Sequence, residues 1–220
     1  ALIFGALLGG VAGFLIGLVL SKFSGDYYAL ASVGFNVIVF TIFLNWQNVT
    51  RGPLGIPGIP RPNMPFLILA SLFLVFAYFA SRFIERSSFG RVLKAIREDE
   101  GAIRVFGYRT DHYKLAVFVI AAGLAAVAGS LFASYITFID PTQFVLFESI
   151  FILAIIILGG LANLKGSVSG ALFLILLPEI LRFVGFPADA AAQMRQLVYG
   201  LLLVLLMLYR PQGLLGEYKL

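Results

Sequence analysis

The sequence predicts an all-α integral membrane protein, a polytopic helical bundle with about seven membrane spans. Three observations support this prediction. Of the 220 residues, 60% are hydrophobic and only 12% are charged, whereas ordinary soluble domains carry about 25% charged residues. The mean hydropathy is +0.99. Runs of roughly 20 apolar residues recur along the chain, which is the length that an α-helix needs to cross a bilayer.

The first span is expected at residues 1–20, which contain no charge. Glycines recur there every four residues and therefore share one helix face, which favours close packing against another helix; they are Gly5, Gly9, Gly13 and Gly17. The chain has no initiator Met and begins inside this apolar segment. We therefore expect residues 1–220 to form a single transmembrane domain that is truncated at its N-terminus.

The second span is expected at residues 27–50, after a short turn at residues 22–26. Asn36 and Thr41 are candidate pore-lining residues, because a polar side chain near mid-span is costly unless it has a partner. The alternative for Asn36 is a hydrogen bond between helices. Residues 51–62 are dense in proline and glycine and predict an ordered, turn-rich external loop.

The fourth span carries a second small-residue face, which is a candidate for helix packing like that of the first span. The sixth is interrupted by Pro178 and Glu179. The third to seventh spans are expected, in chain order, at residues 64–81, 115–139, 144–161, 166–184 and 194–209. The small residues of the fourth span are Ala121, Ala125, Gly129 and Ala133.

Residues 82–114 form the only long polar stretch and hold eight of the 16 basic residues and five of the 11 acidic ones. Ser87 or Ser88 can cap a helix, apolar residues from Phe89 to Phe106 then recur at helical spacing and predict one apolar face, and Gly107 stands where a left-handed C-terminal cap belongs. An amphipathic helix lying on the lipid surface is one interpretation. The acidic triplet at residues 98–100 favours a basic partner protein instead, because anionic lipid would repel it.

The distribution of basic residues predicts the orientation. With seven alternating spans and a cytoplasmic charged stretch, twelve basic residues lie inside and four outside, as expected for cytoplasmic segments. The C-terminus is then cytoplasmic.

Several classes of function are disfavoured. The sequence has no P-loop, no Gly-x-Ser-x-Gly motif, no cysteine and a single histidine, His112, so we expect no enzyme, no cofactor and no metal site. The basic excess lies beside membrane spans, which argues against nucleic-acid binding. The first four spans lack ionisable residues, whereas an ion-coupled carrier usually has them. A channel, an ion-coupled carrier and a membrane scaffold stay open as alternatives.

Several segments together resemble the branched-chain amino acid permeases of ABC transporters, and among them the LivM-type subunit. The first is Ser-Ser-Phe-Gly-Arg-Val-Leu-Lys-Ala-Ile-Arg-Glu-Asp-Glu-Gly-Ala at residues 87–102, followed by Gly107. The others are the loop at 52–62, Gly-Gly-Leu-Ala-Asn-Leu-Lys-Gly at 159–166, Leu-Pro-Glu-Ile-Leu-Arg at 177–182 and Arg-Pro-Gln-Gly-Leu-Leu-Gly at 210–216. Gly101, Ala162 and Ser167 depart from the residues frequent in the family.

The resemblance implies a subunit of the bacterial or archaeal cytoplasmic membrane. Its partners would be a homologous permease, two cytoplasmic ATPase subunits and an external substrate-binding protein. Residues 82–114 would be the cytoplasmic coupling loop, with a coupling helix and turn at 88–107 seated in an ATPase groove. Urea or amide permeases of the same family are an alternative for the substrate. The implied ATPase contacts are Ser88, Phe89, Arg91, Val92, Ile96, Glu98, Asp99, Glu100 and Gly107.

Overall fold

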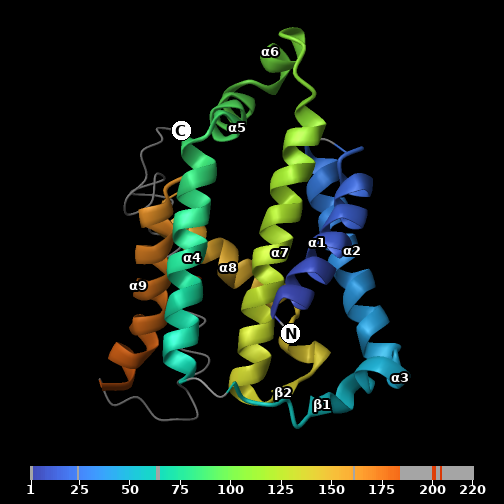
Figure 1. Ribbon diagram of the computed structural model, residues 1–220, viewed down its shortest axis with the longest axis vertical. Coiled ribbons are helices and arrows are strands. Elements are labelled where there is room, and N and C mark those ends of the chain that lie inside the picture. Colours follow the sequence, from blue (N-terminus) through green and yellow to red (C-terminus); the bar gives the residue numbers. More distant parts are fainter. Residues whose placement is uncertain are drawn as a thin grey trace. The chain divides into compact units, whose positions relative to one another are not determined.

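The computed structural model describes residues 2–23, 25–62, 65–160, 162–183, 200, 201 and 204. The chain divides into two compact units, Ala1–Leu146 and Phe147–Leu220. Figure 1 traces the helices in chain order. Each unit is described by itself.

The described part of the chain holds five helical segments that are long and apolar enough to cross a membrane. These match the first five predicted spans. Four lie in the first unit and are α1 (Leu2–Leu20), α2 (Asp26–Asn45), α4 (Phe66–Arg86) and α7 (Thr110–Ile136). The fifth is Pro141–Gly159, formed by the 3-10 helix η2 (Pro141–Gln143) and α8 (Leu146–Gly159).

The sixth predicted span corresponds to α9 (Leu164–Phe183), whose helix continues through Pro178 rather than breaking there. The side chains of residues 177–183, which include Glu179 and Arg182, lie outside the described part of the structure. The seventh predicted span, at 194–209, lies almost entirely outside the described residues, as does the tail.

The glycine face of α1 packs directly against α7. A Cβ atom added at Gly5 would lie 2.7 Å from Ser130 Oγ, and one added at Gly13 would lie 2.5 Å from Ala122 Cβ. At Gly9 the nearest atom is the Ala126 Cβ. The four-residue spacing therefore brings the two backbones close together.

The contact surface on α7 is one residue further along the helix than predicted. The glycines meet Ala122, Ala126 and Ser130. In the predicted set, Ala121 and Ala125 are exposed, Gly129 has no atom within 4 Å of an added Cβ, and only Ala133 is buried. A shift of one residue turns a helix face by about 100°; the sequence offers small residues on both faces.

In the second unit, α8 and α9 cross through glycines. A Cβ atom added at Gly170 would lie 2.6 Å from Ile155 O and 2.7 Å from Gly159 Cα. One added at Gly166 would meet Gly159 O even more closely. The glycine-rich segment at residues 159–170 therefore supplies the crossing point of the two helices.

The proline-rich loop is tied to the end of α7 by a short antiparallel pair. Strand β1 (Ile56–Pro57) pairs with β2 (Phe138–Ile139), with Ile56 opposite Ile139. Around it lie α3 (Gln47–Thr50) and the 3-10 helix η1 (Gly52–Leu54). Figure 1 shows this group at one end of the first unit and the charged stretch at the other.

Candidate functional site

The charged stretch begins with a tight corner between α4 and α5 (Ser88–Glu98). Of the two predicted caps, Ser87 is the one used, and its Oγ accepts a hydrogen bond from Gly90 N at 3.2 Å. A Cβ atom added at Gly90 would lie 2.6 Å from the carbonyl carbon of Glu85 and closer still to the carbonyl oxygens of Ile84 and Glu85. The corner therefore requires glycine at this position.

The apolar face of α5 points into the protein. The Phe89 ring stacks on Tyr113 of α7 with centroids 5.3 Å apart, Ile96 is only 7% exposed, and Val92 is half-buried. The resemblance implied Phe89, Val92 and Ile96 as contacts with an ATPase. Phe89 and Ile96 are instead used largely to seat α5 on the spans, because α5 contacts both α4 and α7.

The expected single helix is broken into two at Asp99. This residue has an extended backbone, with φ −154° and ψ 100°, and its Oδ1 accepts a hydrogen bond from Ala102 N at 3.0 Å. Asp99 thus ends α5 and caps α6 (Glu100–Val105). An aspartate at a helix N-terminus satisfies a free backbone N–H and is a favoured cap.

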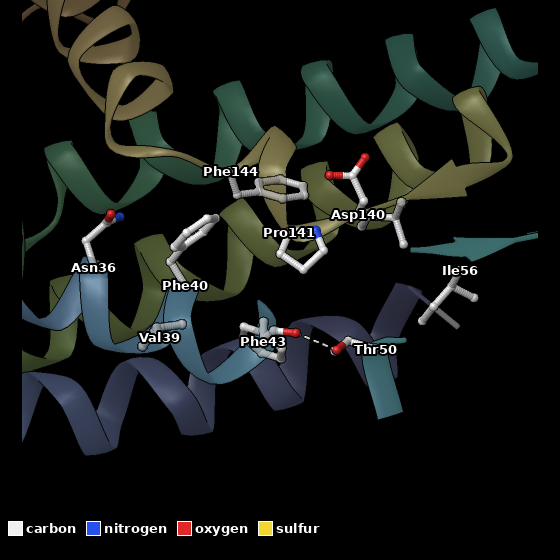
Figure 2. A pocket seen from close by; sticks show the side chains of 10 residues that line it. Asn36, Val39, Phe40, Phe43, Thr50, Ile56, Asp140, Pro141 and Phe144 are labelled. Carbon is white, nitrogen blue, oxygen red and sulfur yellow. Dashed lines mark hydrogen bonds between the residues drawn. The ribbon is translucent and has the colours of Figure 1, made fainter. Parts of the chain in front are cut away.

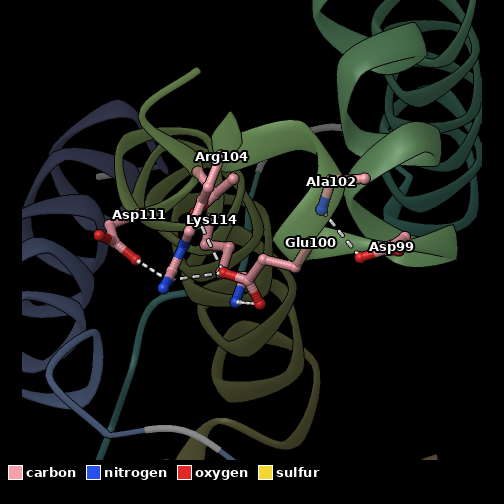
Figure 3. A network of polar contacts seen from close by, with 7 residues as sticks. Asp99, Glu100, Ala102, Arg104, Asp111 and Lys114 are labelled. Carbon is pink, nitrogen blue, oxygen red and sulfur yellow. Dashed lines mark hydrogen bonds and ion pairs between the residues drawn. The ribbon is translucent and has the colours of Figure 1, made fainter. Parts of the chain in front are cut away.

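Glu100 is the centre of a polar network that joins α6 to the start of α7 (Figure 3). Its Oε2 accepts from Lys114 Nζ at 2.5 Å, and its Oε1 accepts from Arg104 Nη2 at 2.9 Å and from Thr110 Oγ1 at 3.0 Å. Arg104 also donates to Thr110 Oγ1 at 2.9 Å and to Asp111 Oδ1 at 3.1 Å. Thr110 is 1% exposed, so the network is anchored on a buried hydroxyl.

This network holds Glu100 in its charged form. Partial burial by itself raises the pKa of the carboxyl, but the hydrogen bonds from Lys114 and Thr110 and the charges of Lys114 and Arg104 outweigh it, so the pKa is lowered. A carboxylate that accepts several hydrogen bonds from cations is stabilised in this way.

The acidic triplet is therefore occupied within the chain. Glu100 bonds to α6 and α7, Asp99 caps α6, and Glu98 pairs with Arg97 at 2.8 Å. Glu98 and Asp99 are exposed, whereas Glu100 is half-buried. In the described part of the chain, no carboxylate lies within ion-pair distance of Arg91 or Arg109.

The stretch ends in a Schellman cap at Gly107, as the sequence predicted. Tyr108 N donates to Ile103 O at 3.3 Å and Gly107 N donates to Arg104 O at 3.0 Å, and Gly107 has φ +85°. This pair of bonds defines the motif and favours glycine at the left-handed position.

Just before this cap lie two highly exposed apolar side chains. Val105 is 86% exposed and Phe106 is 77% exposed, at the far end of the first unit, where Figure 1 places α6. Sequence reasoning assigned Phe106 to the same apolar face as Phe89. The break at Asp99 resets the helix register, so periodicity across it could not reveal that Phe106 points outward.

At the opposite end of the first unit lies a cavity of about 400 Å³ between α2, α3, β1 and the β2–η2 segment (Figure 2). Asn36 lines it. Thr41, the other residue predicted to line a pore, is not among its lining residues, and the Thr41 hydroxyl donates to Val37 O at 2.7 Å within α2. Asp140, 104 positions beyond Asn36 in the chain, also lines the cavity.

No group of three or more potential metal ligands occurs among the described residues. One buried acceptor, Gln143 Oε1 in η2, has no hydrogen-bond partner in this same part of the chain.

Comparison with known proteins gives a consistent result. The model of the family described as "Branched-chain amino acid transport system / permease component" matches residues 1–207. The high-affinity branched-chain amino acid transport system permease protein LivM of Escherichia coli is 34% identical over 95% of this chain and 55% of its own length. The probable LivM of Methanocaldococcus jannaschii is 27% identical over 99% of this chain and 68% of its own length.

A third relative is named for a different cargo. The autoinducer 2 import system permease protein LsrC of Salmonella paratyphi B is 28% identical over 83% of this chain and 55% of its own length. The chain thus spans about half the length of several of the curated relatives it matches. No solved structure matches it.

Proposed function

The chain belongs to the branched-chain amino acid transport permease family, and from this premise we propose that it forms the permease of an ABC importer. The importer would move branched-chain or related amino acids across the cytoplasmic membrane of a bacterium or archaeon. The sequence contains no P-loop, so ATP hydrolysis belongs to a separate subunit. The partners are a homologous permease, two cytoplasmic ATPases and an external substrate-binding protein. The C-terminus lies on the ATPase side.

The observation that carries this proposal is the construction of the charged stretch. A soluble segment between two spans is held by a Schellman cap at Gly107 and by the Glu100 network, and it presents Val105 and Phe106 outward. A rigid projection with an exposed apolar end suits transmission of movement from a partner to the spans, because it binds without first having to be ordered.

We also infer a different set of residues for the ATPase contact. Phe89, Ile96 and Glu100 act as internal supports of the coupling loop. Val105 and Phe106 form the docking tip, a name we use for these two residues. The cations Arg91 and Arg109 lie in the same stretch without a carboxylate partner in the described residues, so the ATPase surface should be an apolar groove with acidic residues at its rim.

The test uses the complete transporter in proteoliposomes. We expect the double variant Val105→Ser and Phe106→Ser to weaken ATPase co-purification by about tenfold or more, because buried aromatic anchors dominate interfaces, and to reduce ATP-driven uptake in parallel. The subunit should reach the membrane in normal amount, since both side chains are largely exposed. Phe23→Ser is the matched control, an exposed aromatic residue just beyond α1. ATPase co-purification and ATP-driven uptake at native levels in the double variant would refute the docking role of Val105 and Phe106.

The cargo needs its own measurement, because a relative of similar coverage is named for autoinducer 2 import. We expect uptake of leucine, isoleucine and valine to exceed uptake of urea and short amides when the cognate binding protein is present. The reverse order would assign the chain to a permease for other cargo while leaving the ATP-driven mechanism in place.

A further inference from the structure

We propose that the cavity in the first unit binds a small aliphatic amino acid, with Asp140 holding its ammonium group and aromatic side chains enclosing its apolar part. The inference rests on the proposed function, for which it supplies the substrate contacts. We call this cavity the outer cavity; its lining residues from α2 are Asn36, Val39, Phe40 and Phe43.

The walls of the outer cavity suit an aliphatic side chain. Phe40 and Phe43 of α2 face Pro141 and Phe144 of the β2–η2 segment, as Figure 2 shows. A volume of about 400 Å³ lies in the range of about 300–1,000 Å³ found for small-molecule sites, which are mostly apolar with a few placed polar groups. The cavity has that composition.

Asp140 supplies one of these polar groups. Its Oδ1 accepts hydrogen bonds from the backbone N and the hydroxyl of Thr142, which fixes the orientation of the carboxylate. Among the described residues, no donor forms a hydrogen bond to its Oδ2 and no cationic side chain pairs with it. A carboxylate oxygen left without a donor in an aromatic-lined cavity is suited to a ligand ammonium group, which brings three donors and a full charge.

Close packing fixes the position of Asp140. Gly55, in the loop before β1, has φ +64°, and a Cβ atom added there would lie 2.9 Å from Asp140 Cβ and 2.6 Å from Ile139 O. The β1–β2 pair then ties this loop to Ile139. Asp140 is thus placed against one distant segment of the chain, residues 55–57, and a binding group held in this way loses little entropy when a ligand arrives.

Asn36 supplies the second polar group, about halfway along α2. Its side-chain amide has no hydrogen-bond partner among the described residues, although a polar group at this depth is costly without one. The amide can donate to a carboxylate and accept from an ammonium group. It can therefore hold either charged end of the same amino acid further along the span than Asp140.

Access to the cavity agrees with import. The cavity lies with β1 and β2 at the end of the first unit away from the charged stretch (Figure 1). In the proposed orientation this end faces the outside, where an amino acid arrives from a binding protein.

The experiment measures direct binding of leucine to the full-length subunit in the complete transporter, without ATP and without the binding protein, by saturation-transfer NMR. We expect leucine and isoamylamine, which carries the ammonium group but no carboxylate, to bind. Isocaproate, which has the carboxylate but no ammonium group, should bind at least about tenfold more weakly.

Asp140→Asn should weaken the binding of leucine and of isoamylamine by about tenfold, because it removes the negative charge that pairs with the ammonium group. Phe40→Ala should weaken the binding of leucine more than the binding of free alanine as a ligand. Asp26→Asn is the matched control, a carboxylate in the first turn of α2, far from the cavity, and should leave binding unchanged.

Equal binding of leucine by Asp140→Asn and the native protein would overturn the inference, as would isocaproate binding as well as leucine. Absence of leucine binding, with a lipid chain retained at the cavity in native mass spectrometry, would also overturn it. These outcomes are separate from those that test the proposed function. ATP-driven uptake without cavity binding leaves the importer intact, and cavity binding without ATP-driven uptake leaves the site but removes the importer.

Discussion

Substitution of Gly90 by alanine tests whether the α4–α5 corner positions the coupling loop. The added Cβ atom would lie 2.6 Å from the carbonyl carbon of Glu85, whereas ordinary contacts begin at 3.4 Å. The nearest atoms belong to the backbone of Ile84 and Glu85, which cannot rotate away as a side chain can. The corner must therefore open by about 1 Å, which would also stretch the cap bond between Ser87 and Gly90 N.

The expected cost can be bounded. Overpacking typically costs about 1–3 kcal/mol and more where the backbone must move, while alanine gains about 1 kcal/mol over glycine in a helix. We expect a net loss of about 1–2 kcal/mol in the local stability of the corner. That loss corresponds to roughly a tenfold decrease in amide protection across α5.

The assay combines hydrogen exchange of peptides covering Ser88–Glu98 with ATP-driven uptake in proteoliposomes. Gly101→Ala is the matched control, because a Cβ atom there meets only the Asp99 carboxylate, at 3.2 Å, and alanine should stabilise α6 slightly. We expect Gly90→Ala to lose protection and uptake while Gly101→Ala keeps both. Amide protection of α5 at the native level in Gly90→Ala would show that the corner accommodates a Cβ atom without opening, and it would refute this prediction.

Three further perturbations test other parts of the structure. Gly9→Leu should lower the Tm of the purified subunit by about 5 °C, because α1 packs against Ala126 of α7 at that point. Gly34→Leu is the control and should leave the Tm unchanged, because a Cβ atom there meets open space. Equal decreases in Tm would contradict the α1–α7 packing. The lowered pKa of Glu100 means that its contribution to stability is complete above the ordinary value of 4.5 and is lost as the pH falls below it. The hydrogen-exchange protection of the α6 amides should therefore decrease from about pH 4.5 downward in the native protein, and it should be low at every pH in Glu100→Gln. Native protein whose α6 protection does not change with pH would refute the network. Gly166→Ala should destabilise the α8–α9 crossing by about 1–3 kcal/mol, seen as faster proteolysis between the two helices, and unchanged proteolysis would argue against the crossing.

The local pattern of the sequence predicted the features that depend on local physics. Apolar runs gave the spans, because length and hydropathy alone determine whether a helix can cross a bilayer. The four-residue spacing of Gly5 to Gly17 predicted a packing face, and Ser87 and Gly107 predicted the ends of the charged segment. Each of these follows from contacts within a few residues of the chain.

The tertiary structure alone decided which long-range contacts form. Glu100 turns toward α7 because Thr110 and Lys114 of α7 offer it hydrogen bonds, and its position in an acidic triplet did not predict these contacts. Likewise Asn36 and Asp140 line one cavity, whose walls include the paired residues Ile56 and Ile139 of β1 and β2. Periodicity and spacing describe one segment at a time, whereas the relative placement of distant segments depends on how their surfaces fit together.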